Sequence, residues 1–97
     1  MEEESGAVRG FIWGKVVDAP PVYDPGGKVC MVDDFVVREP ALWAAVGRAL
    51  LDEVRRLARE RGAVLVVVVC GPHDQPKRAL LAMDDFTVAS EWHVRPC

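Results

Sequence analysis

A strand, a turn, a long helix and a second strand follow one another in the middle of this chain. Residues 29–37 are mostly apolar and β-branched, apolar residues then recur at helical spacing up to Arg61, and residues 63–70 form a continuous apolar run. This order predicts a βαβ unit. Because a helix joins the two strands, we expect them to be parallel and covered on both faces.

The turn into the long helix is the first candidate for a binding site. The first N–H groups of a helix have no partner inside the helix, and the helix dipole places partial positive charge beside them. Such a turn binds anions, and a pyrophosphate is a typical ligand. The functional prediction depends on whether the residues just ahead of Arg48 leave these amides open.

Further elements are expected on both sides of this unit. Residues 7–18 read as a strand, and the turn signals in residues 20–27 predict the loop of a β-hairpin with residues 29–37. After Gly71-Pro72, His73 or Asp74 is placed to cap a second helix that runs to about Met83.

Residues 86–94 read as a last strand. The predicted order is therefore β-β-α-β-α-β, an α/β (α+β) mixed sheet. We expect a single domain over residues 1–97, in which residues 1–6 are a flexible tail.

Two adjacent aspartates interrupt the apolar strand at residues 29–37. Strict alternation places Asp33 on the face of Phe35 and Asp34 on the face of Val32. Because a buried carboxylate is costly, at least one of the two must find a partner or reach water.

The net charge and the apolar content of the chain limit the kinds of partner that it can bind. The net charge is -3 and the pI is about 5.3, so the whole chain offers no general attraction for nucleic acid or an anionic membrane. No apolar run is long enough to span a bilayer, and the acidic N-terminus is unlike a secretory signal. We expect a cytoplasmic protein with no nucleic acid and no membrane as partner. Its three cysteines are expected to be free thiols.

The order of elements over residues 8–94 resembles the GNAT superfamily, the acyl-CoA-dependent N-acyltransferases. The phosphate-binding turn of that family reads Arg/Gln-x-x-Gly-x-Gly/Ala, and the corresponding positions here are Leu42, Ala45 and Gly47. Gly47 matches, Ala45 is a small replacement, and Leu42 replaces the usual Arg or Gln. The strand and two helices with which the family begins have no counterpart in this chain.

A second signature of the family, Tyr-x-x-Gly-Phe, falls on residues 82–86. Phe86 matches, but the tyrosine that commonly protonates the departing thiolate is Ala82, and the glycine is Asp85. General-acid catalysis from that tyrosine position is therefore not expected.

The resemblance implies acetyl-CoA, or another acyl-CoA, as cofactor. It implies a site along the end of the strand and the following turn, with these cofactor-binding residues: Val36, Val37, Leu42, Trp43, Ala44, Ala45, Val46, Gly47 and Arg48. Asp33 and Asp34 precede the turn, where the family often places a general base. The alternative is that both are sheet-face carboxylates that pair with an arginine or face water.

Cys70 and His73 form a second candidate pair, at the end of a strand. A thiol and an imidazole so close in sequence serve in nucleophilic catalysis or bind a metal with a third ligand. The alternative is a buried structural cysteine and a helix-capping histidine. Because no second Cys/His pair has metal-ligand spacing, we expect no metal site.

Two functions fit these patterns. The first is an acyl-CoA-binding protein of GNAT fold, and a possible N-acetyltransferase that transfers an acyl group to an amine. The second is a non-catalytic GNAT-like interaction module that has lost cofactor binding. Because an exposed edge strand invites pairing, we expect in both cases a homodimer formed through the N-terminal hairpin or the last strand.

Overall fold

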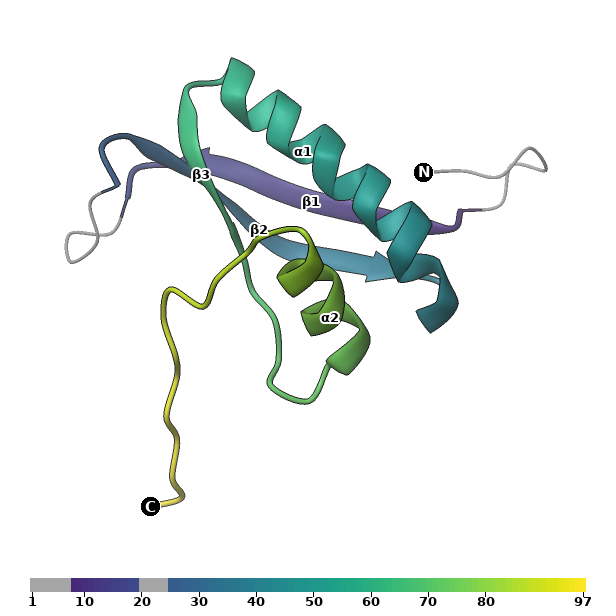
Figure 1. Cartoon of the computed structure of the whole chain (residues 1–97). Coiled ribbons are helices and arrows are strands. Elements are labelled where there is room, and N and C mark those ends of the chain that lie inside the picture. The colour runs from purple at the N-terminus through teal and green to yellow at the C-terminus, as the bar shows by residue number, and fades with distance from the viewer. Residues whose placement is uncertain (1–7, 20–24) are drawn as a thin grey trace.

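The computed structural model describes residues 8–19 and 25–97 of the protein. Its sheet has three strands in the order β1-β2-β3, where β1 is Gly10–Val17, β2 is Lys28–Val37 and β3 is Ala63–Val68. β1 and β2 are antiparallel, as a hairpin requires, and β2 and β3 are parallel (Figure 1). The predicted mixed sheet is confirmed.

The first helical segments begin at Pro40, shortly after the end of β2 at Val37. A 3-10 turn, Pro40–Leu42 (η1), and a wide π turn, Trp43–Gly47 (η2), lead without a break into α1, Arg48–Glu60. Gly62 follows α1 with a φ of 86°, a backbone conformation that favours glycine at a helix end. Both predicted helices are present.

The second helix, α2, is Gln75–Met83. Asp74 caps it, because its carboxylate accepts a hydrogen bond from the N–H of Lys77 at 3.4 Å. Pro76 lies in the first turn, where the missing N–H of proline has no intrahelical acceptor in any case.

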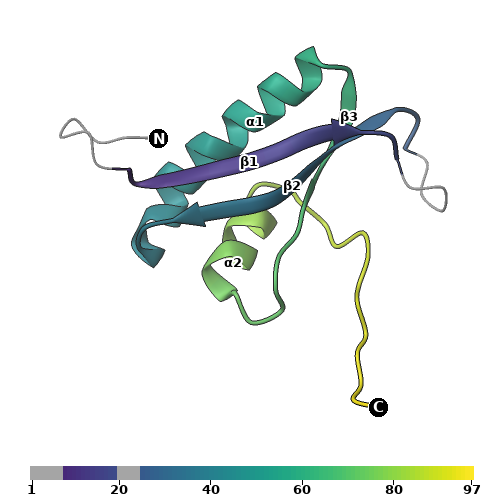
Figure 2. The ribbon, with the colours of Figure 1, turned by 180° about the vertical axis from the view of Figure 1, so that it is seen from behind.

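Both helices pack on one face of the sheet. Figure 1 shows α1 and α2 in front of the strands, and Figure 2 shows the strands in front of the helices. The core between these layers consists of Cys30, Val32, Phe35, Trp43, Val46, Leu50, Leu51, Ala58, Leu80 and Leu81. No helix of the described chain covers the other face, where Phe11, Trp13 and Val36 are exposed. The expectation of a sheet covered on both faces is therefore wrong for the described residues.

A β-bulge at Asp33 changes the faces that strict alternation predicts. Trp13 is opposite Asp34 and Gly14 is opposite Val32, so Asp33 has no partner residue on β1. The extra residue places Phe35 on the same helix-covered face as Val32. Both aspartates are exposed.

The expected last strand is absent. Residues 86–97 form no strand, and the described chain has the order β-β-α-β-α. Asp85 adopts a φ of 64°, and the N–H of Phe86 donates to the carbonyl of Leu81 at 2.9 Å. From that point the segment runs past β3 and away from the sheet (Figures 1 and 2). It therefore pairs with no strand of the described residues.

Some expectations lie outside the described residues. They are the tail at residues 1–6, the start of the first strand at residue 7, and residues 20–24 of the predicted hairpin loop. Within the described ranges, no helix has both the length and the apolar character that are needed to cross a membrane.

Candidate functional site

The two parallel strands, β2 and β3, separate at the carboxyl end of the sheet. The pairing of β2 with β3 ends at Val32 and Val68, and one further bond joins the N–H of Val69 to the carbonyl of Val32 at 3.2 Å. β2 continues to Val37 and still pairs with β1 there. Residues 33–37 of β2 therefore have no partner strand on the β3 side among the described residues.

The candidate general bases lie where this free edge begins. Asp33 is the bulge residue, and Asp34 is opposite Trp13 on the uncovered face of the sheet. Both carboxylates reach water, which satisfies them without an arginine partner. Each is therefore a solvated carboxylate at the start of the free edge.

Val36 and Val37 point to different surroundings. Val36 is exposed on the uncovered face, whereas Val37 packs against the core. A ligand beside the free edge would therefore contact mainly the backbone of these two residues.

The turn after β2 is already helical from Pro40. The N–H of Leu42 donates to the carbonyl of Glu39 at 2.9 Å, and the N–H of Trp43 donates to that of Pro40. The N–H of Arg48 is directed at the carbonyls of Ala45 and Trp43. Because the helical run starts at Pro40, its positive end lies further from Arg48 than the sequence pattern indicates. Wide π turns of this kind are frequent at functional sites.

Three of the predicted cofactor residues in the turn, Trp43, Val46 and Gly47, face inward. The indole of Trp43 is buried and meets the ring of Phe35 edge to face, with centroids 5.0 Å apart. A Cβ on Gly47 would lie 2.8 Å from Cε3 of Trp43 and 3.0 Å from Cδ2 of Leu80. Gly47 therefore allows the indole to pack against the turn, and Val46 is also buried there.

The other predicted residues form the outside of the turn. Ala44, Ala45 and Arg48 are exposed, and Leu42 is half-buried. The alanine side chains are small, and Arg48 adds a positive charge to this surface. Gly47, by contrast, is buried.

A groove of about 340 Å³ separates this turn from α2. Its lining is mainly apolar and includes one cation and one anion: Pro40, Ala41, Trp43, Ala44, Arg48, Pro76, Ala79, Leu80, Met83 and Asp84. The sequence analysis identified the side of the groove that the turn forms, but not the side that α2 forms. The small residue Ala79, one helical turn before Met83, was the available sequence signal for that second side.

Lys77 is an unusually buried cation beside this site. Its side chain is only 12% exposed, and its ammonium lies 5.5 Å from the ring centroid of Trp43 and 5.8 Å from that of Phe35. The Oδ2 atom of Asp74 lies 4.0 Å from this ammonium. The aromatic faces stabilise the ammonium and tie the first turn of α2 to the core.

The Cys70 and His73 pair shows no contact between its two side chains. The thiol of Cys70 donates a long hydrogen bond to the carbonyl of Gly71 at 3.6 Å. Burial raises the pKa of Cys70, and Lys77 partly opposes that rise. No group of three possible metal ligands occurs in the described ranges.

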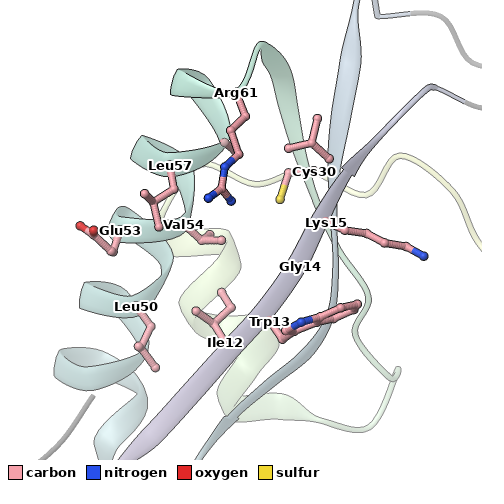
Figure 3. A pocket seen from close by; sticks show the side chains of 12 residues that line it. Ile12, Trp13, Gly14, Lys15, Cys30, Leu50, Glu53, Val54, Leu57 and Arg61 are labelled. Atoms are coloured by element: carbon pink, nitrogen blue, oxygen red, sulfur yellow. The ribbon is translucent and has the colours of Figure 1, made fainter.

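A second, smaller cavity of about 190 Å³ lies between α1 and β1. Figure 3 shows the side chain of Arg61 extending from the end of α1 into this cavity, with Cys30 on the side of the strands and Ile12 and Val54 between the two elements. Burial raises the pKa of Cys30, and the nearby charge of Arg61 acts in the opposite direction. This cavity is not continuous with the groove beside α2, because the two share no lining residue.

No protein-family model matches the sequence, and no curated protein matches it significantly. Solved structures do match. The chain superposes on a protein from Pyrococcus furiosus assigned as an acetyl transferase, with a TM-score of 0.81, 22% identity, and coverage of 99% of this chain and 62% of that one. An aminoglycoside acetyltransferase from an uncultured soil metagenomic sample gives a TM-score of 0.75 and 16% identity, and 98% of this chain and 62% of that chain are covered.

A third structure, assigned as an acetyltransferase, gives a TM-score of 0.73 and 20% identity, with 100% of this chain and 62% of that chain covered. The protein therefore has a GNAT-like acetyltransferase fold. The chain spans 62% of the length of these three structures. At identities of 22% and below, the likeness shows the fold and not the activity.

Proposed function

We propose that the protein binds acetyl-CoA or another acyl-CoA where β2 parts from β3. The observation that carries this proposal is the meeting of three features at one end of the sheet. They are the free edge of β2 at residues 33–37, the start of a helical run at Pro40, and the groove between that run and α2. Ligands of α/β sheets gather at this end of the strands.

The free edge of β2 is suited to an extended ligand with amide groups. Unpaired backbone N–H and C=O groups along a strand bind such a ligand through main-chain hydrogen bonds. The pantetheine arm of a coenzyme A has this chemistry. In the proposal it lies along the backbone of Val36 and Val37.

The outside of the turn is suited to the pyrophosphate. Ala44 and Ala45 are exposed and small, so a ligand can approach this surface closely, and Arg48 adds one positive charge that can pair with a phosphate. Leu42, Trp43, Val46 and Gly47 would hold the shape of the turn. The apolar groove toward α2 would receive the adenosine part of the coenzyme.

A transfer reaction to an amine would use few residues of this chain. Bound acyl-CoA supplies the activated acyl group. Asp33 or Asp34 would accept the proton that the attacking amine loses, because both are exposed at the start of the free edge. Ala82 has no proton to return, so water would protonate the leaving thiolate.

We also propose that the protein acts as a homodimer. Phe11, Trp13 and Val36 leave one sheet face apolar and exposed, and β3 pairs with only one neighbour in the described chain. Such surfaces are stabilised by a second copy.

The alternative function is a non-catalytic dimeric interaction module. Trp43 occupies the space beside Gly47, and neither Leu42 nor Ala82 has the chemistry of the family motif. In that case the fold would persist without cofactor binding.

Hydrogen exchange with and without acetyl-CoA tests the proposed site. We expect the ligand to slow exchange in residues 33–48 and in α2, with α1 beyond Leu51 unchanged. Slowed exchange around the cavity of Cys30 and Arg61 instead would contradict the site. No change at saturating ligand would favour the interaction module.

A further inference from the structure

β3 has the composition of an interior strand but the position of an edge strand. Residues 63–70 contain Ala, Leu, Cys and a majority of valines, with no polar residue. Continuous β-branched runs of this kind are typical of strands that are buried on both faces in the interior of a sheet. In the described chain, however, β3 pairs only with β2, and Val64 and Val69 are 51% and 55% exposed.

An unprotected edge of this composition is a hazard for a free monomer. Natural edge strands carry charges, prolines or bulges that block a further strand. β3 carries no charge and no proline over residues 63–68, and its register shift with β2 lies near its start, at Val64. A second strand is therefore expected on its free edge.

The C-terminal segment, residues 86–94, has the sequence pattern of a strand but pairs with no strand in the described chain. Its even positions, Phe86, Val88, Ser90, Trp92 and Val94, are mostly apolar, and this period of two is that of a strand with one buried face. Yet Val88, Trp92 and Val94 are 68%, 92% and 89% exposed. The segment has a strand pattern but no strand partner.

The direction of the segment favours a partner in another molecule. Asp85 and the bond from Phe86 to Leu81 fix its start on the helix-covered side of the sheet. Both views show it leaving past β3 and extending beyond the sheet, rather than returning along β3 (Figures 1 and 2). Nine extended residues reach about 30 Å, more than the roughly 20 Å that the six residues of β3 require.

We propose that two copies of this chain exchange their C-terminal segments, and that residues 86–94 of each copy pair as a strand with the free edge of β3 of the other. The exchange gives each sheet a fourth strand and buries the apolar side of Val88, Trp92 and Val94. This inference rests on the proposed homodimer and is independent of acyl-CoA binding.

The test is a matched pair of double variants, compared with the wild-type chain. Val88→Glu with Trp92→Glu adds two negative charges to the apolar side of the segment. Thr87→Glu with Ala89→Glu adds the same charge to the other side, where the side chains are also exposed. Sedimentation over micromolar to submillimolar concentrations gives the mass, and hydrogen exchange gives the protection of residues 63–68.

We expect the wild type and the Thr87/Ala89 variant to have twice the 10.7 kDa mass of the chain, with slow exchange in β3. The Val88/Trp92 variant should be a folded monomer by circular dichroism, and the exchange protection in β3 should fall. The emission of Trp92, measured by comparison with Trp92→Phe, should be blue-shifted only in the dimer.

Three results would overturn the exchange. A dimer that survives Val88→Glu with Trp92→Glu would place the interface elsewhere, and the proposed homodimer would still stand. A wild-type monomer with protected β3 amides would mean that the segment pairs within its own chain. A wild-type monomer without that protection would remove both the exchange and the homodimer.

Discussion

The indole of Trp43 and the phenyl ring of Phe35 meet at an interplanar angle of 86°. Phe35 belongs to β2 and Trp43 to the turn that follows, so this contact fixes the turn against the sheet. Lys77 adds its ammonium above both rings. The end of β2, the turn and α2 thus share one packed centre beneath the proposed site.

Gly47 should be essential for the packing of that centre. In Gly47→Ala the new methyl group meets the indole of Trp43 and the side chain of Leu80, and we expect a loss of about 1–3 kcal/mol in the free energy of unfolding. Urea denaturation measures it. Gly71→Ala is the control, because nothing lies within 4 Å of a Cβ there. Equal effects of the two variants would refute this explanation of Gly47.

Arg55 should matter more to stability than Arg56. Arg55 lies 3.8 Å from Asp84 Oδ2, a buried oxygen without a hydrogen bond, in a side chain that is only 11% exposed. Arg55→Met leaves that carboxylate uncompensated, at a cost of about 1–3 kcal/mol. Arg56 contacts Glu53 and Glu60, which are both exposed, so Arg56→Met should have a smaller effect. The reverse order in thermal unfolding would contradict the account of Asp84.

The three thiols should react in order of exposure. Cys97 is exposed, Cys70 is half-buried, and Cys30 is buried with a pKa raised by that burial. At neutral pH we expect an aromatic disulfide reagent to modify Cys97 first and Cys30 last. Fast modification of Cys30 in the folded protein would show that the cavity beside Arg61 admits the reagent.

The raised pKa of Cys30 also predicts that the folded protein loses stability at alkaline pH. Its pKa in the folded protein lies above the ordinary value of 9.0, so its contribution is complete below pH 9.0 and is lost as the pH rises through the folded value. The alkaline decrease in unfolding free energy should be smaller in Cys30→Ala. An unchanged pH profile would mean that Cys30 does not cause it.

Arg48 should contribute to binding and not to stability. Arg48→Glu reverses a charge on the outside of the turn, and we expect at least about a tenfold loss of acetyl-CoA affinity, since a charge-assisted contact contributes about 1.5 kcal/mol or more. Arg59→Glu makes the same charge change near the other end of α1 and is the control. Equal losses would indicate a general charge effect.

Periodicity predicted most of the regular structure. The apolar stripe from Leu42 to Leu57 specified the helix, and the apolar run of residues 63–70 specified a strand, because both patterns extend over several turns or residues. The predicted faces of β2 were wrong after Val32. A bulge needs only one extra residue, here Asp33, and the alternation of apolar and polar residues does not reveal it.

The site was less predictable than the fold. A family motif identified the turn, but the motif did not reveal that Trp43 would fill the space beside Gly47. The prediction of a last strand failed because the sequence pattern of residues 86–94 does not indicate which neighbouring strand has a free edge for it. The burial of Lys77 depends on the Phe35 and Trp43 pair, which is a tertiary contact without a local signal.

A calorimetric titration of the wild-type protein with acetyl-CoA tests the central claim most directly. We predict saturable binding of one ligand per chain, with a negative heat-capacity change from the apolar groove beside α2, and at a hundred times the dissociation constant a gain of about 2.7 kcal/mol in stability. The absence of heat and of any stabilisation at millimolar acetyl-CoA would contradict the claim that this GNAT-like fold binds an acyl-CoA.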